Sequence, residues 1–112
     1  HRRVAPIIEI TRGPDVATEI GDVVISGVVR DDEGVRDVML FHDDNKVFYR
    51  RGALGGTTLP FSIDQVLEPG LNTFYVLARD RQGLSTTTAI STWLTAEMTP
   101  QAANPPAGRE GG

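Results

Sequence analysis

The stretch GLNTFYVLARDRQG, residues 70 to 83, decides the fold predicted for this chain. Its apolar side chains recur at every second position, which is the period of a β-strand with one buried face. Short polar residues, Asn72 and Asp80, stand near its two ends, where such side chains bond to the backbone of turns. We therefore interpret the stretch as one strand of a scaffold and not as the floor of a chemical site. One face carries Asn72, Phe74, Val76 and Ala78, and the other carries Tyr75 and Leu77.

The chain repeats this pattern of short apolar runs, separated by Gly, Pro and Asp, from residue 4 to residue 95. Helical periodicity is nowhere sustained, and β-branched and aromatic side chains dominate the runs. Seven short strands with turns between them predict an antiparallel β-sandwich. Gly27, inside the second strand, predicts a close backbone approach or a bulge. The expected strands are residues 7–11, 22–30, 36–42, 46–50, 61–67, 72–80 and 85–94.

Length and composition set the expected domain organisation. A chain of 112 residues, of which 39% are hydrophobic, has room for one domain with a real core. Residues 96–112 include ten Ala, Pro or Gly and bury too little apolar surface to offset their ordering entropy. We expect an N-terminal arm over residues 1–4, a sandwich over residues 5–95, and a disordered tail or linker over residues 96–112.

Charge and cysteine content exclude several classes of function. The net charge is −4 without a cluster of Lys and Arg, which argues against nucleic-acid binding. The chain has no cysteine, so disulfides, thiolate metal sites and cysteine nucleophiles are excluded. No apolar run approaches the roughly 18 residues of a membrane-spanning helix, and we expect no membrane span.

Two segments of the sequence resemble bacterial immunoglobulin-like or fibronectin-type accessory domains. The first, ISGVVRDDEGVRDVMLF, has their GxVxDxxGV strand and turn, from Gly27 to Val35. The second, LPFSIDQVLEPGLNTFYVLARDRQGLSTT, has their LxPGxNxxxVxAxDxxG pattern, from Leu67 to Gly83. The resemblance covers roughly residues 5 to 95 and implies an immunoglobulin-like antiparallel β-sandwich that is a non-catalytic module.

The stretch RDVMLFHDDNKVFYRR, followed by LPF and LEPGLNTFYVLAR, also resembles the C-terminal β-domain of bacterial C-terminal processing (tail-specific) peptidases. In that family the module follows a PDZ domain and a protease core, and the catalytic Ser and Lys belong to the core. Nothing in this sequence corresponds to those two residues. The resemblance implies a periplasmic or cell-envelope location, with secretion as the alternative.

The acidic turns RDDEG and HDDN are the candidate cation sites, because Ca²⁺ prefers oxygen ligands. Neither turn has EF-hand spacing, and Asp is common in turns for conformational reasons. His42 has only His1 as a second imidazole, so we expect a turn-side histidine and not an acid–base or metal centre. The hydroxyl groups of STTTAIST fit an exposed sheet face. We therefore expect no catalytic residue, no cofactor and no bound metal.

The outer face of two predicted strands carries the candidate interaction surface. The alternation places Met39 and Phe41 on one strand beside Tyr75 and Leu77 on the other, and contiguous apolar patches usually mark a partner surface. Two alternatives are that the GALGG loop covers this patch or that a one-residue bulge inverts the faces. Neighbouring KVFYRR would extend the patch or its edge. The candidate residues are Met39, Phe41, Phe48, Tyr49, Tyr75 and Leu77.

Two hypotheses about function follow. The first is a non-catalytic accessory domain of a larger bacterial envelope or secreted protein, with a C-terminal processing peptidase as the favoured parent. It would act in spacing, docking or protein–protein interaction, with a neighbouring domain, another protein or a second copy of the chain as its partner. The alternative is a carbohydrate-binding module of a polysaccharide-active enzyme. That hypothesis requires exposed aromatic side chains, for which Tyr49 and Tyr75 are better candidates than Trp93 at the end of the last strand.

Overall fold

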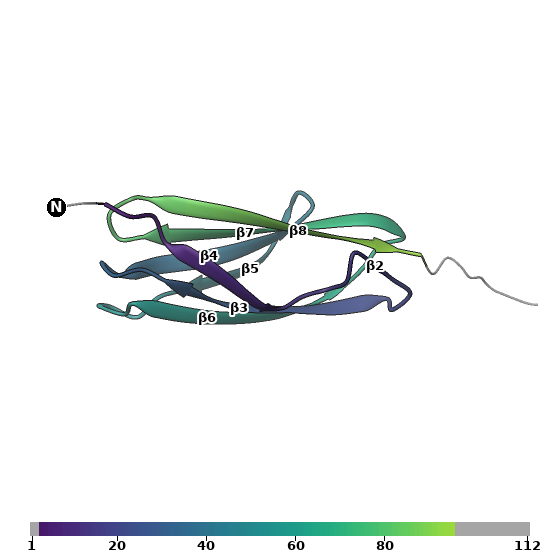
Figure 1. The fold of residues 1–112 in the computed structure, drawn as a ribbon, viewed down its shortest axis with the longest axis horizontal. Helices are drawn as coiled ribbons and strands as arrows, with labels where there is room; N and C mark the ends of the chain where they lie inside the picture. The colour runs from purple at the N-terminus through teal and green to yellow at the C-terminus, as the bar shows by residue number, and fades with distance from the viewer. Residues whose placement is uncertain (1–2, 96–112) are drawn as a thin grey trace, which may run out of the picture.

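The strands of the protein form two sheets that pack face to face (Figure 1). The computed structural model describes residues 3–95, and within them every regular element is a β-strand. One sheet has three strands in the order β1-β3-β6, and the other has five in the order β2-β8-β7-β4-β5. This arrangement confirms the predicted all-β sandwich. The strands are β1 (Ile7–Arg12), β2 (Ala17–Thr18), β3 (Asp22–Arg30), β4 (Val35–His42), β5 (Asn45–Arg51), β6 (Thr58–Val66), β7 (Gly70–Asp80) and β8 (Ser85–Leu94).

The strands lie close to their expected positions, and two of them differ in an informative way. β6 begins at Thr58, before the expected start at Phe61, because Leu59 and Pro60 also pair with β3. Proline is tolerated at that point since β6 is an edge strand. The sequence does not predict β2, which pairs in parallel with the end of β8, because two residues are too few to show a period.

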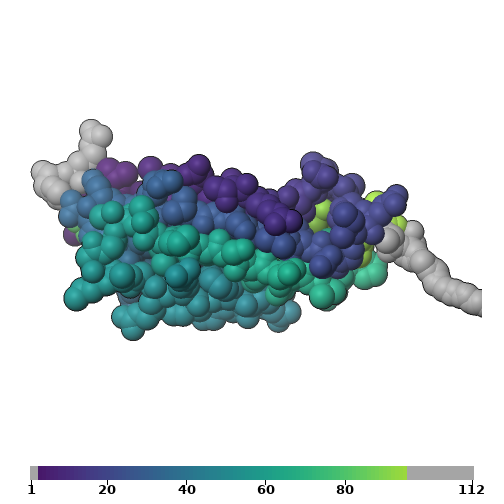
Figure 2. Space-filling model, turned by 90° about the horizontal axis from the view of Figure 1, so that it is seen from below, coloured from purple at the N-terminus to yellow at the C-terminus, as the bar shows by residue number. Residues whose placement is uncertain are grey.

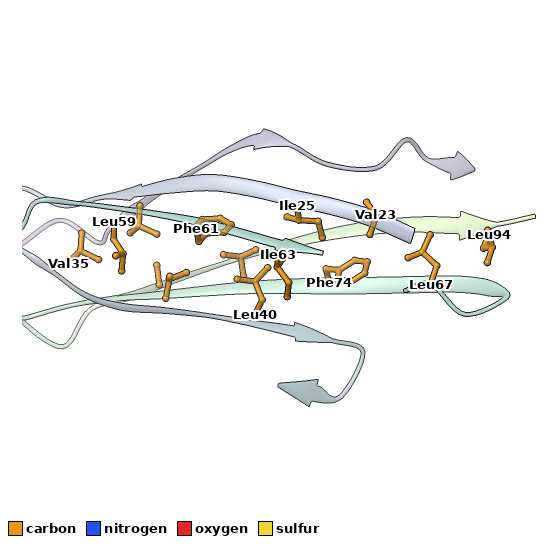
Figure 3. Close-up of a cluster of buried hydrophobic side chains, with 14 residues drawn as sticks. Val23, Ile25, Val35, Leu40, Leu59, Phe61, Ile63, Leu67, Phe74 and Leu94 are labelled. Atoms are coloured by element: carbon orange, nitrogen blue, oxygen red, sulfur yellow. The ribbon is translucent and has the colours of Figure 1, made fainter. Parts of the chain in front are cut away.

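The core lies between the two sheets and is built from the inward-facing residue of each alternating pair (Figure 3). In β7, Phe74 and Val76 are buried while Tyr75 between them is exposed, so the predicted alternation is confirmed. Burial of these side chains is the main stabilising contribution, at about 25 cal/mol for each Å² of apolar surface removed from water. The largest fully buried apolar side chains are Phe74, Ile25, Leu40, Val29, Val35, Val38 and Val76.

Gly27 marks the close approach that its position within a strand predicts. It lies in β3 between the pairing partners Ile10 on β1 and Phe61 on β6. A Cβ atom at this position would meet the backbone oxygen of Glu9 and would lie 2.7 Å from Cζ of Phe61. The aromatic ring of Phe61 therefore occupies the space that a side chain at position 27 would need.

The chain enters the sandwich at one end and leaves it at the other (Figure 1). At the entry, the carbonyl oxygen of Pro6 accepts a hydrogen bond of 2.6 Å from the hydroxyl of Thr86, near the start of β8. At the exit, Thr95 follows the last residue of β8. A strand rises about 3.4 Å per residue, so the two points are roughly 30 Å apart along β8.

Figure 2 shows the elongated face seen from below the view of Figure 1, with β1 in purple along one edge. None of the elements within residues 3–95 is a helix that could cross a membrane. The predicted tail over residues 96–112 and the first two residues of the predicted arm lie outside the described residues.

Candidate interaction surface

The outer face of the five-stranded sheet, the side turned away from the core, holds most of the predicted patch. In the register of β4 and β7, Met39 lies opposite Leu77 and Phe41 lies opposite Tyr75. On the other side of β4, Met39 also lies opposite Tyr49 of β5. The structure therefore places these five side chains next to one another on three adjacent strands.

The five residues contribute unequally to the accessible surface. Met39 is only 7% exposed, so it forms the floor of the patch and not a contact surface. Phe41 and Leu77 are half-buried, whereas Tyr49 and Tyr75 are 47% and 41% exposed. The two tyrosines are the groups that a partner would touch first.

Phe48 lies on the other side of the sheet from Tyr49. It pairs with the inward-facing Leu40 and packs against the core, half-buried. A register shift between Leu40 and Phe41 leaves Val47 as the extra residue of β5, so the alternation changes phase there. The interpretation of Phe48 as a surface residue is therefore corrected, while Tyr49 keeps its place on the outer face.

Two residues that the sequence analysis did not assign to the patch extend it. Leu71 of β7 and Trp93 of β8 lie directly opposite each other, and they are 60% and 51% exposed. Both continue the outward alternation that includes Tyr75 on β7 and Ala89 on β8. The alternation of every second residue would have placed both side chains on the outer face. The expected strand began at residue 72, however, and so excluded Leu71.

The aromatic side chains of the outer face form a diagonal row across the sheet. Trp93 lies one strand and four residues away from Tyr75, and Tyr49 lies two strands and two residues away from it. With about 3.4 Å per residue and about 4.8 Å between strands, the backbone separations are roughly 14 Å and 12 Å. Lys46 adds a cation beside this row, with its Nζ 5.6 Å from the centre of the Tyr49 ring.

The carboxylate of Asp37 is buried at one end of the outer face. Asp37 accepts two hydrogen bonds from the guanidinium group of Arg79, and its Oδ2 also accepts one of 2.8 Å from the hydroxyl of Tyr49. The hydrogen bonds from Arg79 hold the pKa of Asp37 below its ordinary value, although burial acts in the opposite direction. The same pair raises the pKa of Arg79. The carboxylate stays charged, and it fixes the orientation of the Tyr49 ring.

His42 and Asn72 point inward and form a polar cluster in the interior. Asn72 donates to the carbonyl oxygens of Glu68 and Gly70 and accepts from the Glu68 amide, so its Oδ1 is an acceptor. Nε2 of His42, 2.8 Å from that oxygen, is therefore a donor. The imidazole stacks on Phe74 with 4.3 Å between ring centres. Asn72 has the predicted scaffold role, and His42, which directly precedes the turn at Asp43, turns its imidazole into the interior.

The hydrogen bonds of the HDDN turn, one of the two candidate cation sites, explain why an aspartate stands there. In HDDN, the Asp43 carboxylate accepts a hydrogen bond of 3.0 Å from the backbone amide of Thr73, and Asp43 itself adopts a positive φ of 52°. These features give Asp43 a conformational role in the turn. Within residues 3–95, no group of three or more His, Asp or Glu side chains is arranged to hold a metal ion.

The strand orders define an immunoglobulin-like β-sandwich, and its fold resembles that of fibronectin type III-like modules. Among solved structures, the chain is similar to the fibronectin(III)-like modules of CbhA from Clostridium thermocellum, with a TM-score of 0.64 and 16% sequence identity. The match covers 89% of this chain and 54% of that one, so this chain spans about half the length of its structural neighbour. No protein-family model and no curated protein sequence matches the chain. At this level of identity the likeness establishes the fold.

Proposed function

We propose that this domain is a non-catalytic accessory module of a larger bacterial envelope or secreted protein, in which it spaces and docks neighbouring domains. The observation that carries the proposal is the position of the chain ends of the sandwich. Entry beside Thr86 and exit at Thr95 lie roughly 30 Å apart at opposite ends of β8. A module with this geometry extends a chain in a line and holds the domains before and after it apart.

The outer face supports a docking role in addition to spacing. Tyr75, Leu71 and Trp93 expose large apolar areas on one side of one sheet, and such patches mark contact surfaces in soluble proteins. Tyrosine and tryptophan are also the side chains that contribute most to interfaces. We take a neighbouring domain of the same protein as the partner. A C-terminal processing peptidase and a periplasmic location remain the favoured parent and compartment, and both rest on the sequence resemblance.

An immunoblot of fractionated source cells, with an antibody raised against this domain, tests the accessory role. We expect a band far heavier than the 12.1 kDa of this chain, in the periplasmic or membrane fraction. A single band near 12.1 kDa in the cytosol would contradict both the accessory role and the proposed compartment.

The docking role is tested on the parent protein identified in that way. Limited proteolysis and small-angle scattering should show the domain held against its neighbour in the native protein and released in a Tyr75→Ser, Trp93→Ser variant. Val66→Ser is the control, since Val66 is an apolar residue on the other sheet that is even more exposed than Tyr75 or Trp93. Identical behaviour of the native protein and the double variant would exclude docking through the outer face.

A second function is favoured by one specific observation, the row of Tyr49, Tyr75 and Trp93 on a single sheet face. Flat aromatic rings pack against the apolar faces of sugar rings, so a row of this kind suits a polysaccharide chain. Trp93 is the only tryptophan of the protein, and its fluorescence therefore reports directly on this face. A saturable change on titration with a soluble β-glucan or xylan, lost in Tyr75→Ser, would favour a carbohydrate-binding module over a docking module.

A further inference from the structure

Two turns of the same type lie side by side at one end of the sandwich. The first runs from Asp31 to Gly34 and precedes β4, and the second begins at Asp80 and follows β7. The backbone amide of Arg81 donates to the carbonyl oxygen of Gly34 at 3.1 Å and joins the two turns. Each turn therefore presents an aspartate at the same end of the five-stranded sheet.

Both carboxyl groups are buried, and they face each other. Asp31 is 6% exposed and Asp80 is 0% exposed, and their side chains lie within hydrogen-bonding reach of one another. Two buried carboxylates that lie close together repel each other unless a proton or a cation lies between them.

Some of the buried side-chain oxygen atoms in these two turns accept hydrogen bonds, and others have no donor in the described part of the chain. One oxygen of Asp31 accepts from the amide of Glu33, and Oδ1 of Asp80 accepts from the amides of Gln82 and Leu84. Oδ2 of Asp80 and Oε1 of Gln82, which follows in the same turn, are buried and have no hydrogen-bond partner among residues 3–95. Orphaned buried oxygens of this kind require an explanation, such as a bound ion.

The arginines on either side of Asp80 in the sequence are engaged elsewhere. Arg79 is held by Asp37 on the outer face, and Arg81 donates to the carbonyl oxygens of Gly52 and Ala53. Neither guanidinium group is directed at the orphaned oxygen of Asp80. No guanidinium group among residues 3–95 therefore donates to this oxygen, and a proton or a cation is left to balance the two carboxylates.

We propose that Asp31, Asp80 and Gln82 form a binding site for a hard divalent cation, Ca²⁺, that joins the two turns. Two carboxylates and one amide oxygen are ligands that Ca²⁺ prefers, and backbone carbonyl oxygens or water would complete the coordination. The site differs from the sequence expectation of no bound metal, because Asp31 and Asp80 are far apart in the chain and only the fold brings them together. The proposal is independent of the function proposed above.

Thermal unfolding near neutral pH, in chelator-treated buffer with and without about 10 mM Ca²⁺, tests the site. We expect Ca²⁺ to raise the Tm of the native domain by about 5 °C or more. Asp31→Asn and Asp80→Asn should abolish this shift, and because asparagine keeps an oxygen for the backbone amides, both variants should fold. Asp32→Asn, at an exposed turn position, is the matched control and should keep the shift.

Titration calorimetry of the native domain with Ca²⁺ provides a readout that does not depend on any variant, and we expect one site per chain. An unchanged Tm and no binding heat would overturn the proposal, as would an equal Tm shift in the Asp31→Asn variant. If instead the Tm rises on acidification and is insensitive to Ca²⁺, Asp31 holds a proton that it donates to Asp80, and there is no cation site.

Discussion

The guanidinium group of Arg79 on β7 binds the carboxylate of Asp37 on β4 through two hydrogen bonds, 2.8 Å from Nε to Oδ1 and 2.6 Å from Nη2 to Oδ2. The two residues lie directly opposite each other in the register of the sheet. Tyr49 on β5 bonds to the same carboxylate, so one buried charge connects three adjacent strands. Paired charges with this bidentate geometry are stronger than ordinary surface ion pairs.

Asp37→Asn is expected to lower the free energy of unfolding by about 2 kcal/mol near neutral pH, because it removes a charge-assisted pair and leaves Arg79 without its partner. The pKa of Asp37 is lower in the folded protein than in the unfolded chain, so its contribution is present above the unfolded pKa. That contribution is lost as the pH falls through the folded pKa. Urea denaturation of both proteins between about pH 7 and pH 3 measures the difference.

The difference in the free energy of unfolding between the native domain and the Asp37→Asn variant should therefore become smaller below about pH 4. A difference that is the same at every pH would show that the loss comes from packing and not from the charge. Tyr49→Phe is a milder companion variant that removes only one hydrogen bond and should cost about 1 kcal/mol.

Gly27→Ala is expected to destabilise the domain by about 2 kcal/mol or more, because the new Cβ would overlap Phe61 and the backbone oxygen of Glu9. Gly21→Ala is the matched control, since a Cβ at position 21 would meet nothing within 4 Å. The control should be neutral or stabilising by a few tenths of a kcal/mol. Equal midpoints of denaturation for the two variants would contradict the close approach at Gly27.

Asn72→Ala is expected to lower the free energy of unfolding by about 3 kcal/mol. The change leaves the carbonyl oxygen and the amide of Glu68 without their side-chain partner, and it also removes the acceptor for His42. Amide hydrogen exchange gives a local readout, because the amide of Glu68 should lose its protection before the strands open. Retained protection at Glu68 would show that Asn72 does not hold this corner between β6 and β7.

Phe74→Ala and Tyr75→Ala compare the two faces of β7 at adjacent positions. Phe74 is fully buried, so its truncation leaves a cavity and should cost about 4 kcal/mol. Tyr75 is 41% exposed, and its truncation should cost less than about 1 kcal/mol. Chemical denaturation of the two variants checks the assignment of faces, and a reversal of the two costs would mean that the register is shifted by one residue.

The period of two was sufficient to predict most of the sandwich, because strands such as β3, β6 and β7 alternate between a buried face and a more exposed one. It placed Phe74 inside and Tyr75 outside, and it also placed Met39 beside Leu77 on the outer face. It did not predict the orientation of Phe48, because the extra residue in β5 is a feature of the pairing between β4 and β5. Nor did it predict β2, which is defined only by its contact with β8.

What the sequence by itself determined is therefore local: the strands, their buried faces, the turns and the scaffold role of Asn72. Alternation and turn chemistry act between residues that are neighbours in the chain, so they can be recognised without the fold. The tertiary structure alone decided which distant side chains meet. Asp37 with Arg79, Leu71 with Trp93, and Asp31 with Asp80 come together across strands. Their pairing depends on strand order and register, which are set by the packing of the two sheets as a whole.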